Sequence, residues 1–427
     1  MEIYDYQQAF GAWDKTSPAM RKAIREWLTL YYRDTPEENT DPCQRIAYTV
    51  VSKLVRGVFA EYSLTAPDPV LKKFLAGLED IRTQAVQLAL VGGECYIKPW
   101  VDGKNFRFSL IPRDNILIFG RDARGNPVDI GTVERSVGGK YYYTLLERRQ
   151  LSGGKLTITN QLYRSLNDRS IGDAVPLNTH PLYEALAPKY TYPLDSLGLV
   201  RLKTPMLNCV DGSSDGVSVY AAAAGLIRAI DKNEAQLSGE FERGQSRIVV
   251  SKDMLTGEGL TDSLFVGLDE DPDRVGINIF SPQLREQSFL ARKQEYLRNV
   301  ESVIGLKRGL LSNANVEERT ATEIAASGAD YSLTVMDFQN MWTSGVRELA
   351  VLCASLSKLF RLGEVTDVTV TPDWGNGVLF DEEKRWADYR QMVADGLLKP
   401  EIALGWRFDL PASTEEERAV IRDRLMP

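Results

Sequence analysis

Two stretches decide the fold, and they read VSVYAAAAGLIRAIDKNEAQLSGEFE (Val217–Glu242) and LREQSFLARKQEYLRNVESVI (Leu284–Ile304). In both, apolar residues recur every three or four positions, the spacing of one buried helix face. In the first they are Val219, Tyr220, Ala223, Leu226, Ile227, Ile230, Leu237 and Phe241, and in the second Phe289, Leu290, Tyr296, Leu297, Val300, Val303 and Ile304. Ser281 and Pro282 have the residue types of an N-cap and a first helical position. The pattern predicts two amphipathic helices.

These helices would be roughly 39 and 31 Å long, so they can lie side by side as a hairpin. The intervening residues 246–283 alternate β-like pieces with glycines, which predicts a small β-containing cap at the hairpin tip. Packing within one chain covers only part of the apolar stripe. The remaining apolar positions would be most easily buried by the same hairpin in neighbouring subunits.

Composition places the chain among ordered globular proteins. Its 427 residues suffice for two or three domains, and 43% are hydrophobic and 26% charged. With 59 acidic and 51 basic side chains the net charge is −8, which argues against gripping nucleic acid by bulk charge but not against letting DNA slide past. No apolar run has the 18 or so residues of a membrane span, and the N-terminus is unlike a signal peptide. We expect a cytoplasmic protein at synthesis, with no membrane contact.

The first 90 residues are predicted to be helical. Three start signals, Ser17-Pro18, Asp41-Pro42 and Asp68-Pro69, open helices that would run to about Tyr32, Glu61 and Leu90. From Gly92 to about Arg164 six β-rich runs are separated by turn signals, which predicts one antiparallel sheet of short strands. Residues 165–210 lack a clear period and contain five prolines, which favours an extended connection.

Beyond the hairpin, Gly305 is a natural helix-ending residue and residues 306–319 resemble a loop. Thr320 and Glu323 have the form of a capping box for a helix that could reach Phe360, about 60 Å, with Gly328 and Gly345 as possible bends. The tail predicts one strand, VTDVTVTP (residues 365–372), and two or three short helices. Ser413 and Glu416 suggest a second capping box.

Chemistry for catalysis is scarce. The single histidine, His180, is interpreted as a loop residue without a special task, and Ser218 lacks the second glycine of a nucleophile elbow. The four cysteines, Cys43, Cys95, Cys209 and Cys353, are far apart and are interpreted as buried thiols. No cofactor or metal site is predicted.

Two charged groups have two interpretations each. The acidic run Asp269–Asp273 resembles the start of a calcium loop, but Arg274 and Phe280 occupy the positions of the turn glycine and the last ligand, which favours a solvated turn. Lys307 and Arg308 follow a helix end, where cations meet the helix dipole favourably. That is a sufficient structural reason for them, and the alternative is transient contact with phosphates.

With hairpin, insert, loop and long helix in this order, the chain resembles the portal proteins of tailed bacteriophages, particularly those of phages with long, non-contractile tails. The resemblance rests on three groups of residues: Asp215-Gly216-Val217-Ser218-Val219-Tyr220 leading into Ile230-Asp231-Lys232, Ser246-Arg247-Ile248-Val249-Val250, and Gly305 followed by Arg319-Thr320-Ala321-Thr322-Glu323-Ile324. None of these is a catalytic signature.

The resemblance implies an α+β portal fold and a homo-oligomeric ring, usually of twelve subunits, at one capsid vertex of the virion, assembled in the host cytoplasm. Double-stranded DNA would pass through it during packaging and ejection. Its other partners would be the terminase large subunit, a head-completion or adaptor protein, the scaffold and the major capsid protein. The implied parts are a wing (1–215, 320–362 and 363–380), two stem helices (216–245 and 284–304), a clip (246–283), a tunnel loop (305–319) and a crown (381–427).

The same resemblance implies three sets of site residues. The DNA-facing set in the tunnel loop is Lys307, Arg308, Ser312, Asn313 and Asn315. The clip set that docks partners is Asp262, Asp269, Glu270, Asp271 and Asp273. The stem set for oligomerisation is Phe289, Leu290, Tyr296, Leu297 and Val300.

Two other classes of function stay open. A hydrolase using carboxylates of the tail would need a pocket of adjacent acid, base and orienting groups, which the sequence does not show. A non-channel structural protein of a capsid or secretion assembly would share the oligomerising helices and the scarcity of catalytic chemistry. The shape of the purified particle would separate the three classes.

Overall fold

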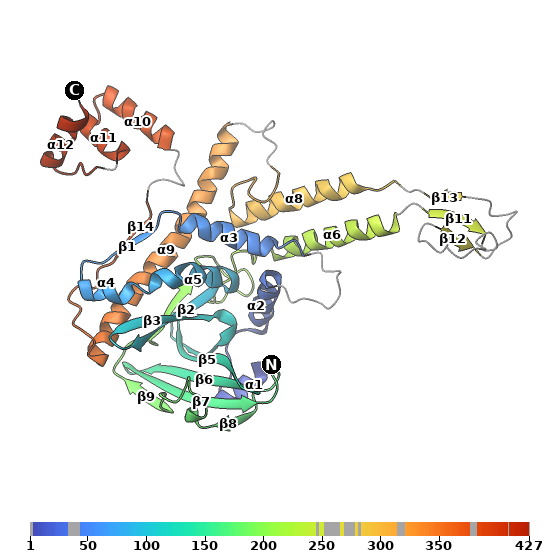
Figure 1. The fold of residues 1–427 in the computed structure, drawn as a ribbon, viewed down its shortest axis with the longest axis horizontal. Helices are drawn as coiled ribbons and strands as arrows, with labels where there is room; N and C mark the ends of the chain where they lie inside the picture. The colour runs from blue at the N-terminus through green and yellow to red at the C-terminus, as the bar shows by residue number, and fades with distance from the viewer. Residues whose placement is uncertain are drawn as a thin grey trace. The chain divides into compact units, whose positions relative to one another are not determined.

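The computed structural model describes residues 3–32, 43–244, 247–251, 265–268, 278–280, 283–313, 321–375, 382–408 and 410–426. The chain has two units, one of Met1–Val55 with Ala66–Val370 and one of Arg56–Thr65 with Thr371–Pro427. Blocks of helices and blocks of strands follow one another along the chain (Figure 1). The α+β class expected from the sequence is confirmed.

The helices described in the N-terminal part are α1 (Ile3–Phe10), α2 (Pro18–Tyr31), α3 (Ile46–Val58), α4 (Pro69–Leu75) and α5 (Leu78–Gly92). Two of the predicted start signals are confirmed. The Ser17 hydroxyl accepts a hydrogen bond from Met20 N, and the Asp68 carboxylate accepts from Val70 N and Leu71 N. The Asp41-Pro42 signal lies outside the described residues, and α3 ends at Val58 rather than Glu61.

The single helix expected from Asp68 to Leu90 is wrong, because the chain breaks into α4 and α5 at Ala76 and Gly77. Glycine is a poor helix former, and a Cβ at Gly77 would lie 3.5 Å from the Phe108 ring. Phe74 at the end of α4 makes an edge-on contact with Phe106, with ring centroids 5.0 Å apart. Phe106 and Phe108, which belong to one β-strand, thus lie against the end of α4 and against the break between α4 and α5.

The six predicted β-rich runs are all strands, but they belong to two sheets instead of one. Strands β2 (Glu94–Asp102) and β3 (Asn105–Pro112) pair with β10 (Val200–Lys203) in the order β10-β2-β3. The second sheet has the order β4-β5-β6-β7-β8, with β9 also paired to β7. Its strands are β4 (Ile116–Arg121), β5 (Pro127–Gly138), β6 (Tyr141–Ser152), β7 (Lys155–Ser165), β8 (Asp173–Val175) and β9 (Lys189–Tyr192).

A short 3-10 turn at Arg113–Asn115 separates β3 from β4 and ends the first sheet there. The region 165–210 is also different from the expected extended connection, because it supplies β8, β9 and β10. In these segments, which prolines interrupt, strand pairing gives hydrogen-bond partners to backbone N–H and C=O groups that would otherwise bind water. The tight hairpin turns follow the sequence: Ser152 pairs with Lys155 across Gly153 and Gly154, which have φ of 57° and 70°.

Helices α6 (Ala224–Arg243) and α8 (Glu286–Ile304) correspond to the two stretches of the hairpin. Helix α6 begins seven residues later than predicted, because residues 217–223 pack into the core as turns. Val217, Val219 and Tyr220 are buried there, and Tyr220 Oη donates to Trp27 O at 2.8 Å. The proposed N-cap of α8, Ser281-Pro282, lies outside the described residues.

Between the two helices the chain forms β11 (Arg247–Ser251), β12 (Phe265–Leu268) and β13 (Asn278–Phe280) in the order β12-β11-β13. Strand β11 pairs parallel with β12 and antiparallel with β13. The three predicted β-like pieces of the insert are therefore strands.

Helix α9 (Ala321–Phe360) has 40 residues, so it is about 60 Å long as predicted. Its proposed capping residue Thr320 lies outside the described residues. Gly345 serves close packing: a Cβ there would lie 2.3 Å from a methyl carbon of Leu202 in β10. The glycine lets the helix approach the sheet.

The second unit pairs β1 (Ser63–Thr65) with β14 (Thr371–Asp373) and contains helices α10 (Glu382–Ala394), α11 (Pro400–Arg407) and α12 (Glu415–Leu425). The predicted strand at residues 365–372 is therefore wrong in extent, since pairing to β1 begins at Thr371. The second capping box is shifted by one residue, because Thr414 and Glu417 form it instead of Ser413 and Glu416.

In the described part of the chain, none of the helices has both the length and the apolarity that crossing a bilayer would require.

Candidate nucleic-acid interface

Helices α6 and α8, called the helix pair below, lie side by side (Figure 1). Their buried apolar side chains are Ile227, Ile230 and Leu237 on α6 and Leu297, Val300 and Ile304 on α8. We call these six buried side chains the seam of the protomer, and fully burying one such side chain contributes about 1.5–3 kcal/mol.

Polar contacts fix the relative position of the two helices. Asn233 Nδ2 donates to Phe289 O at 3.1 Å, joining a buried side chain of α6 to the backbone of α8. Closer to the insert, Arg285 donates to Glu240 from Nε at 2.9 Å and from Nη2 at 2.6 Å. These hydrogen bonds lower the pKa of Glu240 to about 2. Polar contacts therefore hold the two helices together where α8 begins.

The five residues predicted for oligomerisation are in different environments. Leu297 and Val300 are buried within the protomer, so they serve its own seam. Phe289 and Tyr296 are partly buried, and Arg285 and Arg292 lie over their rings. Only Leu290, 42% exposed, is available at the surface.

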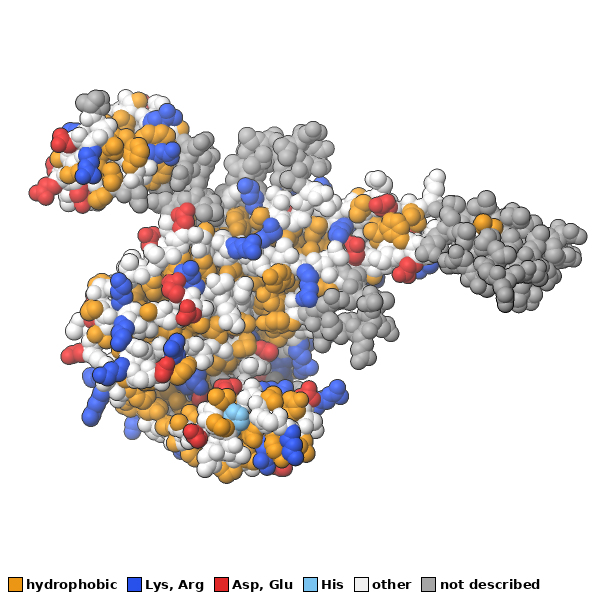
Figure 2. All heavy atoms as spheres, in the orientation of Figure 1, with side chains coloured by type: hydrophobic (Ala, Val, Ile, Leu, Met, Phe, Trp, Pro, Cys, Tyr) orange, Lys and Arg blue, Asp and Glu red, His pale blue; other side chains and the backbone are white. Residues whose placement is uncertain are grey.

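Other exposed apolar side chains accompany Leu290 on the helix pair. They are Phe241 on α6 and Val303 on α8, together with Leu284 just before α8. Figure 2 shows hydrophobic side chains at the surface of this pair among acidic and basic ones. Exposed large apolar side chains grouped on two helices are a common property of protein interfaces.

After α8, Gly305 ends the helix in a left-handed conformation with φ of 77°, as the sequence predicts. The loop of residues 305–313, called the 305–313 loop below, then makes a tight turn in which Leu310 N donates to Lys307 O at 3.1 Å. Gly309 has φ of 92°, the positive value that the third position of a type II turn requires. Lys307 and Arg308 are exposed, and they occupy the first two positions of this turn.

The other residues of the predicted DNA-facing set are placed differently. Ser312 is buried, and its hydroxyl donates to Glu301 Oε2 at 2.8 Å, so it belongs to the interior of the loop. Asn313 is exposed, and its backbone N donates to Gln294 Oε1 at 2.8 Å. Asn315 lies outside the described residues, as do the five acidic residues predicted for partner docking.

One residue that contacts this loop was missed in the sequence. Glu301 is 1% exposed, and its carboxylate accepts hydrogen bonds from the backbone of Gly309, Leu311 and Ser312 as well as from the Ser312 hydroxyl. A signal was present, because Glu301 occupies the same helix stripe as Leu297, Val300 and Ile304. A carboxylate on an apolar stripe has to find donors when it is buried.

The approach to α6 is held by a second buried carboxylate, that of Glu94 in β2. Arg201 of β10 donates to it through Nε at 3.0 Å and also through Nη2, and Gly216 N donates at 2.6 Å. Burial alone would raise the pKa of Glu94, but Arg201 and Arg113 outweigh burial and lower the pKa to about 2. Glu94 therefore ties the two strands to the segment that leads into α6.

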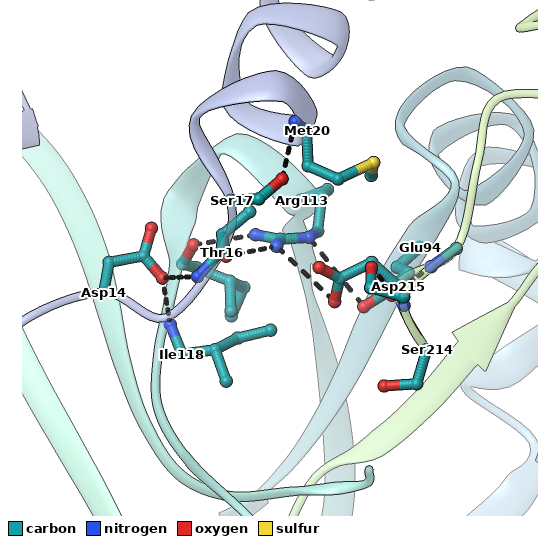
Figure 3. Close-up of polar contacts among 12 residues, drawn as sticks. Asp14, Thr16, Ser17, Met20, Glu94, Arg113, Ile118, Ser214 and Asp215 are labelled. Atoms are coloured by element: carbon teal, nitrogen blue, oxygen red, sulfur yellow. Dashed lines mark hydrogen bonds and ion pairs between the residues drawn. The ribbon is translucent and has the colours of Figure 1, made fainter. Parts of the chain in front are cut away.

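Arg113 lies between Thr16 on one side and Glu94 and Asp215 on the other (Figure 3). Its Nη2 donates to Thr16 Oγ1 at 2.9 Å, and its Nε is 3.9 Å from Glu94 Oε2. Asp215 also pairs with Arg121, with Nη2 and Oδ1 2.5 Å apart. The segment Ser214–Val217 is thus anchored to the N-terminal region and to both sheets before α6 begins.

Residues considered for catalysis have structural contacts. His180 is buried, with its ring 4.6 Å from that of Tyr143 and 5.2 Å from that of Tyr183. The Ser218 hydroxyl donates to Leu90 O at 3.1 Å.

The interpretation of all four cysteines as buried thiols is wrong for Cys209, which is exposed, and for Cys43, which is partly exposed. Among the described residues, no cluster of three or more His, Cys, Asp or Glu side chains could hold a metal ion.

A comparison with known families gives a match over most of the chain. The model of the family described as "Phage portal protein, SPP1 Gp6-like" matches residues 76–419, a range that contains the helix pair, the 305–313 loop and α9. A comparison with curated proteins found none that matches. Because the match spans most of the 427 residues, the chain belongs to the SPP1 Gp6-like family of phage portal proteins, structural proteins of the virion that serve genome packaging in tailed phages.

Proposed function

We propose that this chain is the subunit of a ring, of twelve copies as is usual in its family, through which double-stranded DNA enters the capsid and later leaves it. The helix pair is the stem, residues 246–283 are the clip, residues 305–319 are the tunnel loop, α9 belongs to the wing and residues 381–427 form the crown. One observation carries the proposal: a helix pair with exposed apolar side chains leads directly into a turn that exposes Lys307 and Arg308.

The charges fit a conduit. Each phosphate that a protein neutralises adds affinity through counterion release, so a strongly basic channel would hold DNA instead of passing it. The chain has a net charge of −8, which limits that adhesion. Two cations per subunit on a turn, with the exposed amide of Asn313 nearby in sequence, would steady the duplex without trapping it.

The proposed mechanism is passive for this chain. The sequence contains no phosphate-binding loop of the Walker type, so the energy for DNA movement would come from a separate motor, the terminase large subunit. The clip, with Asp262 and the acidic run Asp269–Asp273, would dock the terminase and later a head-completion or adaptor protein. The scaffold and the major capsid protein would surround the ring at the capsid vertex.

Electron microscopy and mass measurement of the purified protein test this proposal. We expect rings with a central hole wide enough for a DNA duplex and a mass that is an integral multiple of 47.8 kDa, near twelve subunits. A compact particle of one or two chains at all concentrations, also with scaffold present, would favour the hydrolase alternative. Sheets or filaments without a hole would favour a non-channel structural protein.

Leu290→Asp tests the helix pair as the contact between subunits. In the monomer this side chain is exposed, so the substitution should change the stability of the fold by only about 0.5 kcal/mol. In a ring it would place a charge in every apolar contact, and we expect the fraction of assembled rings in size-exclusion chromatography to fall at least roughly tenfold. Gln287→Asp adds the same charge at an exposed polar position of α8 and serves as the control. If the wild type and Leu290→Asp assemble equally well, Leu290 does not lie in the contact between subunits.

A further inference from the structure

Glu301 is a negatively charged residue in a place that disfavours negative charge. It lies in the last turn of α8, where the helix dipole opposes an anion, and it is 1% exposed, so it has lost its contact with water. A buried carboxylate at a helix C-terminus needs several hydrogen-bond donors. The positions of those donors indicate the structural role of Glu301.

The donors come from the 305–313 loop. Backbone N–H groups of Gly309, Leu311 and Ser312 donate to Oε1 at 3.1, 2.5 and 2.9 Å, and the Ser312 hydroxyl donates to Oε2 at 2.8 Å. A carboxylate has about four acceptor sites, so these four bonds use most of its capacity. Hydrogen bonds to an ionised group are roughly twice as strong as bonds between neutral groups. One side chain thus collects backbone donors from three positions of one short loop.

The same loop is held at its first residue by α9. Thr334 Oγ1 lies 3.1 Å from Gly305 O and 3.0 Å from Asp330 O, so the hydroxyl can donate to either carbonyl. A Cβ at Gly305 would come within 2.4 Å of this hydroxyl oxygen, so the approach depends on glycine. Leu306 is buried as well, and its N donates to Glu301 O at 2.8 Å.

These contacts enclose the turn that carries the two cations. Residues 305 and 306 are fixed before it, residues 309, 311 and 312 are fixed at and after it, and between them Lys307 and Arg308 remain exposed. A loop tied on both sides of its tip has few conformations left, so its tip points in a defined direction. The hydrogen bonds that fix residues 309, 311 and 312 all go to the Glu301 carboxylate.

We propose that Glu301 is the positioning residue of the 305–313 loop: its carboxylate organises the backbone of Gly309, Leu311 and Ser312 and so fixes the direction in which Lys307 and Arg308 project. The organisation of the loop stands on the geometry alone. Its use in holding DNA rests on the proposed function. The loop then moves together with the end of α8 instead of as a free tether, so a displacement of the helix displaces the cations.

Hydrogen–deuterium exchange of the intact, assembled protein tests the organisation of the loop. In Glu301→Ala, peptides covering residues 305–313 should exchange at least about tenfold faster, because three amides lose their acceptor. Glu295→Ala removes an exposed glutamate from the same helix and should leave the loop unchanged. Peptides of α5 and of β6 report on global stability, and a residue that only stabilised the fold would accelerate exchange there too.

Two milder variants keep the test valid if Glu301→Ala does not fold. Glu301→Gln retains one oxygen for the three N–H donors and can donate to the Ser312 hydroxyl, but it loses the charge, so the exchange rate should lie between those of the wild type and Glu301→Ala. Ser312→Ala removes one of the four bonds and should accelerate exchange the least. Loop protection equal to that of the wild type in both Glu301 variants, or in Glu301→Gln alone should Glu301→Ala not fold, would overturn the proposal.

DNA packaging by heads containing Glu301→Ala rings separates the two parts of the argument. We expect less packaged DNA although Lys307 and Arg308 are still present, because their direction is no longer fixed. Faster loop exchange with normal packaging, together with normal packaging by a variant that lacks both cations, would refute the DNA contact and leave the positioning role intact. Unchanged loop exchange would refute the positioning role whatever the packaging result.

Discussion

Heads assembled with the double variant Lys307→Ala/Arg308→Ala should contain at least about tenfold less packaged DNA than wild-type heads, although rings form normally. The two side chains are exposed on the turn of the 305–313 loop, and the hydrogen bonds from this loop to Glu301 come from other residues. A hydrogen bond to a charged group contributes about 1.5–3 kcal/mol, and 1.4 kcal/mol corresponds to a factor of ten. The measurement is nuclease-protected DNA per head, with ring assembly checked by chromatography.

Lys72→Ala/Lys73→Ala is the matched control, because these two lysines are also adjacent and exposed, but they lie on α4. The variant Lys307→Arg/Arg308→Lys keeps both positive charges. It should retain most of the packaging if the contact is with phosphates, because both lysine and arginine bind them. Normal filling of heads by the double alanine variant would show that the cations are not needed for packaging.

Glu94→Ala should destabilise the protein by about 3–5 kcal/mol, the usual effect of removing one partner from a buried ion pair. The side chain is fully buried, and its loss leaves Arg201 and Arg113 without their carboxylate and Gly216 N without its acceptor. Urea unfolding followed by circular dichroism measures the change. Glu79→Ala, which breaks the half-exposed ion pair with Arg82, should cost at most about 1 kcal/mol.

The same residue predicts a pH dependence. The pKa of Glu94 is about 2 in the fold, below the value of roughly 4.3 expected for an unfolded chain. A depressed pKa means that the ionised form stabilises the fold above about pH 4.3 and that this contribution is lost as the pH falls toward 2. Glu147, paired with Arg149 and Lys98, behaves in the same way. The stability of Glu94→Gln should therefore fall less steeply over this range, without becoming flat.

A stability loss below 1 kcal/mol for Glu94→Ala, or identical pH profiles for Glu94→Gln and the wild type, would contradict the assignment of Glu94 as the anchor of the segment before α6.

Local signals predicted the elements that depend on local chemistry. Ser17 and Asp68 cap the helices that they were expected to start, Gly305 ends α8 in a left-handed conformation, and Gly153-Gly154 makes a hairpin turn. Each of these outcomes depends on one or two residues and their own backbone. The capping box of α12 was predicted one residue too early. Ser413 and Thr414 are adjacent and both carry a hydroxyl that can cap a helix, and the structure uses Thr414 with Glu417.

Pairings between distant segments were not predictable in this way. Strand β10 joins β2 although about a hundred residues separate them, and residues 217–223 have a helical pattern but pack as turns against Leu90 and Trp27. The periodicity of apolar residues says which side of a segment is buried, not what buries it. The same limitation applies to Leu297 and Val300, predicted for contacts between subunits and found in the seam of one protomer.

By itself the sequence determined the helix pair, the strand-forming insert between its helices, the cationic turn after it and the family resemblance, because periodicity, capping and glycine positions are properties of short stretches. Only the tertiary structure decided which side chains hold these parts in place. In the sequence Glu301 shows only that it shares a stripe with apolar residues, and nothing near Glu94 names its partners; folding buries each where arginines or backbone amides converge on it. A carboxylate's role is set by the donors that surround it, and those donors come from segments that meet only in the fold.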